Sequence, residues 1–565
     1  MNETTDFDAI VVGSGITGGW AAKELTERGL KVLVLERGSD IQHGRDYQGE
    51  HMPSWDIPFR GKPLRELYEE EYSVQSRCYA FDETNRQFWN NDKENPYVPT
   101  PDKPFMWQRA DVVGGRSLIW GRQSYRWSEQ DFLANKQDGH GVDWPIRYRD
   151  LEPWYRHVED FIGVSGQAEG LSALPDSDFL PAMELNVVEK KAKARIEEEF
   201  PERTYTIGRT AILTEPKEGR GTCHYCGPCE RGCSVGAYFS SQSSTLPAAK
   251  KTGNLTLLPD SVVHSLEYSE NEHRVSGVRV IDAHSGDKKT YRSKLVFLCA
   301  STVASAQILL NSKSAAFPNG LANRSGVVGH YLMDHAMGPG AIGVIPGYEE
   351  YVEYGNRPTG GYVPRFRNVD SQDKDTEFLR GYGYQVYIGR GGWKSMYDKT
   401  PGFGESLKTQ LRSPGPWTMF MLGYSECLPQ YDNAISLDER KLDRFGIPQI
   451  RFDFSFGSNE DAMIPDMTKQ AAAMIRTVGG VEVMERTNRG LPGEAIHEMG
   501  TVRMGRDPAT SALNAYNQTH DVPNLFVTDG SCMTSSSCVN PSLTYMAITA
   551  RAVDIAVGLL REGKV

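Results

Sequence analysis

Four of the nine cysteines lie within one eleven-residue loop, where they could bind iron or zinc. They belong to GTCHYCGPCERGCSVGAYFSSQ, residues 221–242, and are Cys223, Cys226, Cys229 and Cys233. The spacing C-x2-C-x2-C-x3-C is that of a bacterial ferredoxin run, although Ser234 replaces the proline that usually follows. The fourth cysteine of such a run serves a second cluster, and the sequence has no second run. The spacing therefore predicts an iron–sulfur cluster, either [3Fe–4S] on three cysteines or [4Fe–4S] with Cys233 included.

Two other interpretations of this loop stay open. A structural zinc ion would take four ligands from a very short segment, which strains a tetrahedral site compared with two separated C-x2-C pairs. Free structural thiols need no metal. The five other cysteines lack the spacing of a disulfide framework, which favours a reducing compartment during folding. They are Cys78, Cys299, Cys427, Cys532 and Cys538.

The N-terminal segment DAIVVGSGITGGWAAKELTERGLKVLVLERG is typical of a dinucleotide-binding unit. It predicts a strand, the turn G-x-G-x-x-G formed by Gly13, Gly15 and Gly18, a helix to about residue 28, and a second strand ending at Glu36. The glycines allow a tight turn, a close approach to a pyrophosphate, and close packing of helix on strand. The helix N-terminus would bind phosphate, and Glu36 would accept hydrogen bonds from a ribose. The N-terminal position favours FAD, with NAD as the alternative.

Length, charge and hydropathy exclude several classes of protein. At 565 residues the chain exceeds the size of a single hydrophobic core, so we expect two large domains. A net charge of −12 without a basic run argues against a nucleic-acid partner. No run of 18 apolar residues predicts a membrane span, and LVFLCASTVASAQILL is more typical of a strand followed by a helix. The N-terminus has neither the basic nor the apolar region of a secretion signal.

Five further motifs follow one another along the chain. They are VVGGRSLIWGRQSYRW (112–127), DWPIRYRDLEPWY (143–155), LVFLCASTVASAQILLNS (295–312), SGVVGHYLMDH (325–335) and a block at 497–552 that begins HEMGTVRMG. Together they resemble the glucose–methanol–choline (GMC) flavin oxidoreductase family over nearly the whole chain. The resemblance implies an α/β fold with a Rossmann-like FAD-binding domain and a substrate domain of antiparallel sheet and helices. Within the family, the cysteine loop and DRFGIP resemble the flavin subunits of bacterial fructose, gluconate and glucoside 3-dehydrogenases.

The resemblance places further flavin contacts in two of these motifs. Gly114, Gly115 and Ser117 belong to GGRSLIWG, where glycines let the backbone approach the flavin without a Cβ; a tight turn is the alternative. Asp529, in NLFVTDGS, matches an acid that lies near the ribityl and phosphate groups, and is otherwise an ordinary turn residue. Some relatives bind flavin covalently through a histidine where Ile119 stands here. We therefore expect non-covalent FAD.

The resemblance also assigns the acid–base chemistry. Hydride transfer from an alcohol carbon to flavin needs a base for the hydroxyl proton, and histidine titrates in a suitable range. In this family one motif carries the catalytic histidine and another carries a second His or Asn, and these motifs match His497 and Asn540. We therefore expect His497 to be the general base and Asn540 to hydrogen-bond the reacting oxygen. Asn540 and Pro541 are expected to open a helix whose positive end faces the flavin. The alternatives are a core histidine for His497 and a helix N-cap for Asn540, and His335 is interpreted as structural or as a domain-boundary residue.

The two predicted domains are discontinuous. The FAD-binding domain takes 1–45, 106–145, 220–335 and 495–565, with the cysteine loop at 221–236, and the substrate-binding domain takes 46–105, 146–219 and 336–494. LGYSECLPQ and QIRFDFSF suggest an antiparallel sheet in the second domain. Segment 46–126 is rich in aromatic residues, which suit either the faces of a pyranose or an ordinary core. They include Trp55, Tyr68, Tyr72, Tyr79, Phe81, Trp89 and Trp107.

The resemblance implies an FAD-dependent dehydrogenase that oxidises a secondary hydroxyl of a sugar or glycoside, with C3 of a glucoside favoured. Its electrons would leave through the iron–sulfur cluster to a cytochrome or quinone. A small chaperone-like subunit and a cytochrome c subunit are implied as partners, with a periplasmic location by co-export or a cytoplasmic one. An O2-using oxidase of the same fold without a cluster is the first alternative. A non-catalytic electron-transfer subunit is the second, against which His497 and Asn540 argue.

Overall fold

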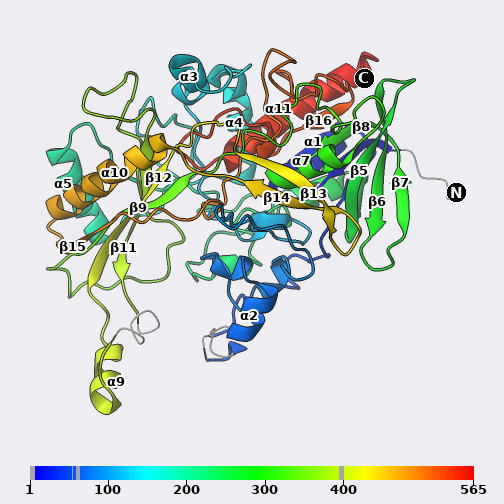
Figure 1. Ribbon diagram of the computed structural model, residues 1–565. Helices are drawn as coiled ribbons and strands as arrows, with labels where there is room; N and C mark the ends of the chain where they lie inside the picture. Colours follow the sequence, from blue (N-terminus) through cyan, green and yellow to red (C-terminus); the bar gives the residue numbers. More distant parts are fainter. Residues whose placement is uncertain (1–6, 54, 59–63, 393–399) are drawn as a thin grey trace.

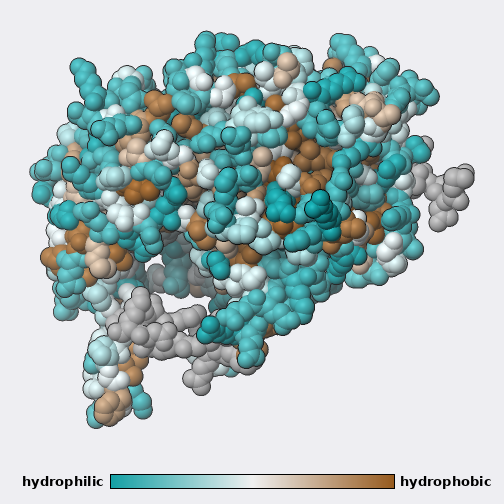
Figure 2. All heavy atoms as spheres, in the orientation of Figure 1, coloured by the Kyte–Doolittle hydropathy of each residue, from teal (hydrophilic) through white to brown (hydrophobic). Residues whose placement is uncertain are grey.

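Two sheets of different construction frame the molecule (Figure 1). The computed structural model describes residues 7–53, 55–58, 64–392 and 400–565. The first six residues, on which the expectation about a secretion signal partly rests, lie outside these ranges. In Figure 1 the larger sheet, with α5 and α10, lies at one end of the molecule, and the C-terminus lies at the other. The visible face is mostly hydrophilic, with hydrophobic residues in small groups (Figure 2).

The first sheet has five parallel strands in the order β16-β8-β1-β2-β4. They are β1 (Phe7–Val12), β2 (Val32–Leu35), β4 (Leu255–Leu258), β8 (Ser293–Leu298) and β16 (Leu525–Val527). The middle strands are continuous apolar runs, because parallel sheets are covered on both faces. Ala9 and Val11 share one core with α1 (Ile16–Glu27) and α11 (Ser542–Arg561), while Ile10 and Val12 face the core that contains α7 (Thr302–Asn311). The predicted strand–helix–strand start and the strand-to-helix segment β8–α7 are confirmed.

The second sheet has six strands in the order β15-β9-β12-β11-β10-β3, and every pairing is antiparallel. They are β3 (Thr206–Ile207), β9 (Ala336–Val344), β10 (Gly361–Val363), β11 (Tyr382–Arg390), β12 (Trp417–Ser425) and β15 (Val481–Arg486). Helix α10 (Ser458–Thr477) packs on β9, β12 and β15, and α5 (Val187–Glu199) packs on α10. Buried Met463, Met467 and Ile475 of α10 join the core beneath this sheet.

One predicted strand belongs elsewhere. LGYSECLPQ begins within β12 as expected, but QIRFDFSF covers most of β14 (Pro448–Asp453), which forms a separate two-stranded sheet with β13 (Ala434–Leu442) and an isolated bridge from Arg451 to Val98. Phe452 of β14 stacks on Phe105 and meets the edge of Tyr97. These aromatic contacts draw β14 towards the first core and away from the six-stranded sheet.

The remaining elements are short or peripheral. A three-stranded antiparallel sheet follows the order β5-β6-β7, with bounds Ser261–Ser269, Arg274–Asp282 and Lys288–Tyr291. The other α-helices are α2 (Arg65–Glu71), α3 (Glu129–Asp138), α4 (Tyr148–Ile162), α6 (Thr245–Lys251) and α9 (Gly404–Arg412). Short 3-10 turns lie at Gln75–Arg77, Arg86–Phe88, Gly115–Leu118, Cys229–Arg231 and Gly530–Cys532. Figure 1 shows α9 and α2 projecting from the same side of the body.

Helix α11 differs from the expectation that no segment is apolar enough to span a membrane. Within the described ranges it is the one helix that could cross by length and composition, with a mean hydropathy of 1.5. The expectation counted uninterrupted apolar runs, whereas α11 reaches this value with a few polar residues among many apolar ones. Its apolar window is 61% buried, and it packs against α1 and α4. This burial is typical of a core helix.

Candidate active site

A cavity of about 780 Å³ lies at the carboxyl ends of strands of the parallel sheet. Residues that follow these strands line it, namely Gly13 after β1, Glu36 after β2, Cys299 after β8 and Asp529 after β16. Strand β1 has β2 on one side and β8 on the other, so the strand order reverses at this point. Open α/β sheets bind ligands at such a switch point.

The start of α1 forms an open cradle in the cavity wall. Gly15 occupies the cap position of α1, and no side chain of the described residues caps its N–H groups. A Cβ on Gly15 would meet no atom within 4 Å, so it would project into open space. Gly115 lies against Gly15, with a φ of +49°. Unpaired N–H groups at a positive helix end, without side chains in front of them, suit a pyrophosphate.

The other two glycines of the motif shape the turn. Gly13 has a φ of +93°, and a Cβ there would lie 2.5 Å from the carbonyl oxygen of Cys299. Gly18 does not line the cavity. It packs against the turn, where a Cβ would collide with the carbonyl oxygen of Gly13. Gly18 therefore lets α1 pack tightly against the end of β1.

Glu36 is fixed by the turn that precedes α1. Its Oε2 accepts hydrogen bonds from the backbone N of Ser14 at 2.9 Å and from Ser14 Oγ at 2.5 Å, and its Oε1 accepts from Gly38 N at 2.8 Å. Burial raises the pKa of this carboxyl group. Gly114 N donates to Ser14 Oγ at 2.9 Å, so one serine joins both glycine motifs to the acid. Gly114 itself lies behind the cavity wall.

Ser117 and Asp529 hold loops on opposite sides of the cavity. Ser117 Oγ donates to the carbonyl of Gly114 at 2.6 Å and accepts from Ser241 N at 3.0 Å. Asp529 accepts from the backbone N of Ser301 at 3.0 Å and from the hydroxyl of Ser305 at 2.5 Å. Burial raises the pKa of Asp529. Both residues line the cavity, but their polar atoms already have protein partners.

These features fit FAD. A pyrophosphate fits the cradle at Gly15 and Gly115, and a ribose fits beside Glu36. Ile119 also lines the cavity and offers no nucleophile, so non-covalent binding stays the prediction. Helix α11 begins at Ser542, one residue later than expected, with Pro541 in the cap position and Asn540 ahead of the helix. Asn540, Pro541 and Ser542 all line the cavity.

His497 is held in place through its backbone. The carboxylate of Asp334 accepts from His497 N at 3.1 Å and from Gly493 N at 2.8 Å, which closes the loop between them. Ile496, directly before His497, has a φ of +61°, a conformation that β-branched residues rarely adopt. Strain of this kind persists where the surroundings over-determine the backbone, as they often do at functional sites. Ile496 and His497 line the cavity.

The side chains of His497 and Asn540 meet in the cavity. Nδ2 of Asn540 lies 3.1 Å from Nε2 of His497. Gln385 Nε2 donates to Asn540 Oδ1 at 3.2 Å, and the hydroxyl of Tyr387 donates to Gln385 Oε1 at 2.9 Å. The structure thus places the two predicted catalytic residues in contact. Two β11 side chains that the sequence did not single out, Gln385 and Tyr387, extend this set of contacts.

Burial sets the protonation states around this pair. It lowers the pKa of His497 well below the usual histidine value, with His335 and Arg116 acting in the same direction. Arg116 is itself paired with Glu498 at 2.8 Å. Burial, helped by Glu498, raises the pKa of Asp334 to about 7. At neutral pH His497 is therefore an unprotonated imidazole, as a general base must be.

The wall facing the pair is polar. It includes Gln123, Thr359, Tyr387 and Tyr424, and an ion pair in which Arg122 Nη1 lies 3.0 Å from Glu230 Oε1. Arg122 has a φ of +58°, and its Nε has no partner among the described residues. Of the aromatic residues named from the sequence, Tyr79, Trp89 and Trp107 line the cavity. Tyr68, Tyr72 and Phe81 pack against one another instead, and Trp55 is 77% exposed.

The four loop cysteines have different surroundings. Cys223 and Cys233 pack on a small apolar cluster that includes Ile212, Cys226 is exposed, and Cys229 lines the cavity. Burial raises the pKa of Cys229 to about 12, so that thiol is protonated at neutral pH. Nowhere in the described parts of the chain do three His, Cys, Asp or Glu side chains form a group that could hold a metal ion. The metal site predicted from the spacing finds no support in this arrangement.

Three groups that contact the predicted pair were not assigned to the site from the sequence. His335 was interpreted as structural, yet its Nδ1 lies 3.0 Å from Nδ1 of His497. Asp334, its neighbour in LMDH, holds the main chain of His497. Gln385 comes from the middle of β11, where nothing local marks it. The position of LMDH within a recognised motif was the one available signal for the first two.

The comparisons agree with this geometry. Two family models described as GMC oxidoreductase match residues 7–337 and 429–549. The 2-methyl-1,2-propanediol dehydrogenase of Mycolicibacterium austroafricanum is 28% identical over 563 residues, which cover 97% of this chain and 94% of that protein. The fructose dehydrogenase large subunit of Gluconobacter japonicus is 25% identical over 572 residues, which cover all of both chains.

A solved structure shows the same fold. The pyridoxine 4-oxidase from Mesorbium loti superposes with a TM-score of 0.61 at 17% identity, covering 98% of this chain and 99% of that one. Its fold, the family matches and the cavity geometry lead to one assignment. The chain belongs to the GMC oxidoreductase family and is an FAD-dependent oxidoreductase that acts on CH–OH groups.

Proposed function

We propose that the protein is a dehydrogenase that oxidises a secondary hydroxyl group of a sugar or glycoside. The observation that carries this proposal is the contact between His497 and Asn540, in one cavity with the glycine cradle and with several polar side chains. The amide, hydroxyl, guanidinium and carboxylate groups among them match the several hydroxyl groups of a sugar, and a few placed polar groups of this kind give a pocket its specificity.

The residues of the chain supply the proton transfer. The substrate hydroxyl group gives its proton to Nε2 of His497, and its oxygen accepts a hydrogen bond from Nδ2 of Asn540. FAD, when bound, would supply the acceptor for the hydride of the carbon that bears this hydroxyl group, and the product would be a carbonyl compound. The positive end of α11, at Pro541 and Ser542, faces the cavity and favours negative charge there.

The substrate class and the oxidised carbon are tested by reductive half-reaction kinetics. Stopped-flow reduction of the FAD-loaded enzyme would be compared for methyl glucosides, fructose, gluconate and 1,2-propanediol. We expect the fastest reduction with a glucoside and a primary isotope effect only with deuterium at C3. Fastest reduction by the simple diol would overturn the sugar assignment, and an isotope effect at another carbon would overturn only the position.

The route of the electrons is the second part of the proposal. The cysteine spacing supports an iron–sulfur cluster, and the loop borders the cavity through Gly227, Cys229 and Glu230. Among the described residues the four thiols form no group that could hold a metal ion, which favours the alternative, an O2-using oxidase without a cluster. Iron and acid-labile sulfide per FAD, measured on anaerobically purified protein and followed by EPR, separate the two. About three or four irons per FAD support the cluster, whereas none, with peroxide formed from O2, supports the oxidase.

Partners and compartment follow from the same family relationship. The similarity to a protein named as a large subunit supports assembly with other subunits. We propose a cytochrome c subunit as electron acceptor, a small chaperone-like subunit, and co-export to the periplasm, with the cytoplasm as the alternative. Co-purification from the native cell followed by fractionation tests all three. A lone chain in the cytoplasmic fraction would contradict them.

A further inference from the structure

Both ring nitrogens of His335 have a partner in the protein interior. The residue is 1% exposed. Its Nε2 lies 3.1 Å from the carbonyl oxygen of Ser536, and its Nδ1 lies 3.0 Å from Nδ1 of His497. Since a carbonyl oxygen can only accept, Nε2 of His335 carries the hydrogen of that bond.

The protonation state of His335 then fixes that of His497. Burial lowers the pKa of His335 to about 4, so the ring is neutral at neutral pH and its Nδ1 has a free lone pair. A contact between two Nδ1 atoms needs one donor, and that donor must be His497. The neutral His497 ring therefore carries its hydrogen on Nδ1. Its Nε2, which lies beside Asn540 in the cavity, is left without a hydrogen.

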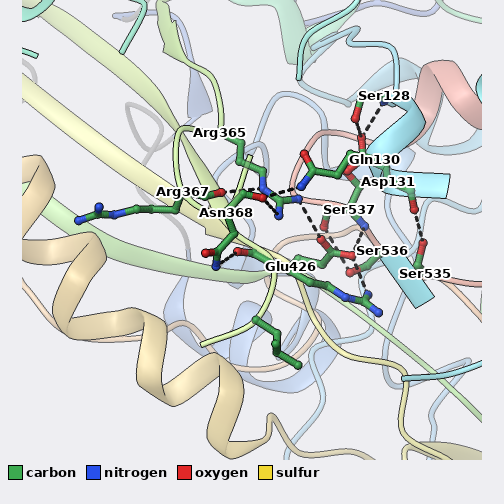
Figure 3. A network of polar contacts seen from close by, with 12 residues as sticks. Ser128, Gln130, Asp131, Arg365, Arg367, Asn368, Glu426, Ser535, Ser536 and Ser537 are labelled. Atoms are coloured by element: carbon green, nitrogen blue, oxygen red, sulfur yellow. Dashed lines mark hydrogen bonds and ion pairs between the residues drawn. The ribbon is translucent and has the colours of Figure 1, made fainter. Parts of the chain in front are cut away.

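The carbonyl that orients His335 is itself held by a buried network (Figure 3). Ser536 Oγ accepts from Cys427 N and donates to the carbonyl of Cys427, both at 3.0 Å. The next residue, Ser537, is held as well: its Oγ donates to Asp131 at 2.8 Å, and its backbone N donates to Glu426 at 3.2 Å. Figure 3 shows these serines gathered against Asp131 and Glu426. The peptide that accepts from His335 thus has little freedom to turn.

We propose that His335 is a positioning residue that sets the tautomer of His497, so that the bare Nε2 faces the substrate hydroxyl. The proposal rests on the role of His497 as general base. When His497 takes the hydroxyl proton on Nε2, both of its nitrogens carry hydrogen, and its Nδ1–H bond to His335 becomes charge-assisted and stronger. His335 stays neutral throughout and takes no proton. It contributes orientation and stabilises the imidazolium that forms.

Three substitutions separate this role from a purely structural one. His335→Asn places an amide oxygen near the position of Nδ1 and keeps an acceptor for His497. His335→Gln keeps a donor towards Ser536 and loses that acceptor, and His335→Leu loses both. The matched control is His330→Gln, five residues upstream, where the ring stacks on Tyr431 outside the cavity.

The first readout is flavin reduction by substrate in stopped flow, with flavin absorbance and melting temperature as checks on folding. We expect His335→Gln and His335→Leu to slow reduction by about 100-fold with little change in substrate affinity, and His335→Asn to stay within about tenfold of wild type. His330→Gln should reduce at the wild-type rate. Equal rates for the Asn and Gln variants, at equal flavin content and melting temperature, would overturn the proposal. If the Leu variant does not fold, the Asn–Gln comparison decides.

The second readout does not depend on activity. In protein labelled with 15N-histidine, nitrogen chemical shifts distinguish protonated from bare ring nitrogens, and His497→Gln identifies the signals of His497. We expect Nδ1 of His497 to be protonated and Nε2 to be bare at pH 7 in wild type, with that bias lost in His335→Gln. A bare Nδ1 in wild type would overturn the proposal. A different outcome would count against the proposed substrate alone. In that outcome wild-type His497 has the expected tautomer and His497→Ala reduces flavin slowly, but the wild-type enzyme oxidises no sugar.

Discussion

The catalytic pair and the cysteine loop are both short motifs of reactive residues, yet their surroundings are opposite. His497 and Asn540 bind each other, and Asp334, His335 and Gln385 hold them from three sides. The loop cysteines have different surroundings instead: one is exposed, one lines the cavity and two pack on an apolar cluster. Imidazole and amide groups are good hydrogen-bond donors and acceptors, whereas a thiol is a weak donor and a weak acceptor. The first site is therefore held together by hydrogen bonds of the chain itself, whereas the described loop cysteines form no such group.

Removal of the base tests the organised site most directly, and we expect the largest effect there. His497→Ala should lower the rate of flavin reduction by about 10²- to 10⁴-fold, because Nε2 of His497, beside Asn540 in the cavity, is the atom expected to take the hydroxyl proton. Flavin content and absorbance should be unchanged, since the cradle at Gly15 and Gly115 is left intact. Stopped-flow reduction measures the rate, with His330→Ala as the control. A variant reduced at near the wild-type rate would remove His497 from the mechanism.

A substitution in the buried network that holds Ser536 and Ser537 should destabilise the protein around the same site. Arg380 pairs with Glu426 and Asp138, both at 2.7 Å, and is almost fully buried. Arg380→Met leaves two acids without their partner, so we expect a loss of about 3–5 kcal/mol in the free energy of unfolding. Urea unfolding of the holoenzyme measures it. Arg65→Met, in an exposed pair with Glu69, is the control and should cost no more than about 0.5 kcal/mol.

The two losses in that experiment have to differ for the comparison to hold. Equal losses for Arg380→Met and Arg65→Met would mean that the network adds no more than a surface ion pair. The backbone of Ser536 and Ser537 would then owe its position to packing alone.

The free energy of unfolding below pH 7 should depend on the buried side chain of His335. His335 has its pKa lowered to about 4 by burial, so the folded state favours the neutral ring. Its contribution to stability is complete above the ordinary histidine pKa and is lost as pH falls from about 6.5 to about 4, by about 3 kcal/mol in total. Urea unfolding across this range should show that slope in wild type, and a shallower one in His335→Asn. Parallel slopes would contradict a buried neutral ring.

The other titratable groups around His335 are present in both proteins, so they largely cancel in this difference. They are Asp334, His497, Tyr424, Arg116 and Glu498. Asp334 acts with the opposite sign, because burial raises the pKa of its carboxyl group to about 7. Its contribution is present at low pH and is lost as pH rises towards 7.

The sequence predicted those parts of the fold that local patterns encode. The strand–turn–helix start has a glycine for each steric demand, so α1, β2 and the end of β1 were placed within about a residue, whereas β1 begins three residues before the predicted Ile10. Segment β8–α7 was readable because an apolar run gives way to a helical one. The separate pairing of β14 with β13 was not, because it depends on aromatic partners such as Phe105, which lies far away in the sequence.

The site divides in the same way. His497 and Asn540 stand in recognisable motifs, and the structure brings them together. Gln385 carries no local signal, since it is one residue of a regular strand and gains its importance only from lying opposite Asn540. His335 was visible in its motif but was read as structural, because a second histidine cannot be paired with the first without the fold. The cysteine spacing identified candidate ligands, but a spacing does not fix the directions of side chains.

The catalytic cavity and the cysteine loop meet at Glu230, which belongs to the loop and pairs with Arg122 of the cavity wall. Glu230→Gln removes the charge while keeping the shape. We expect KM for a sugar to rise by about tenfold with kcat little changed, as for a group that binds substrate and transition state equally. Steady-state kinetics with a dye acceptor measures both constants. A fall in kcat alone would place Glu230 in the chemistry or in electron exit instead.

The smallest effect on the fold is expected at the exposed loop thiol, where the comparison is sharpest. Cys226→Ser should change the free energy of unfolding of metal-free protein by no more than about 0.5 kcal/mol, because the side chain is exposed. If a cluster organises the loop, the same substitution lowers iron per FAD and slows one-electron reoxidation while flavin reduction keeps its rate. Cys78→Ser, at a buried thiol outside the loop, should do the reverse and destabilise the fold without loss of iron. No iron in wild type, with equal oxygen consumption in Cys226→Ser, would mean that glycines and ion pairs such as Arg122–Glu230 hold the loop without a metal.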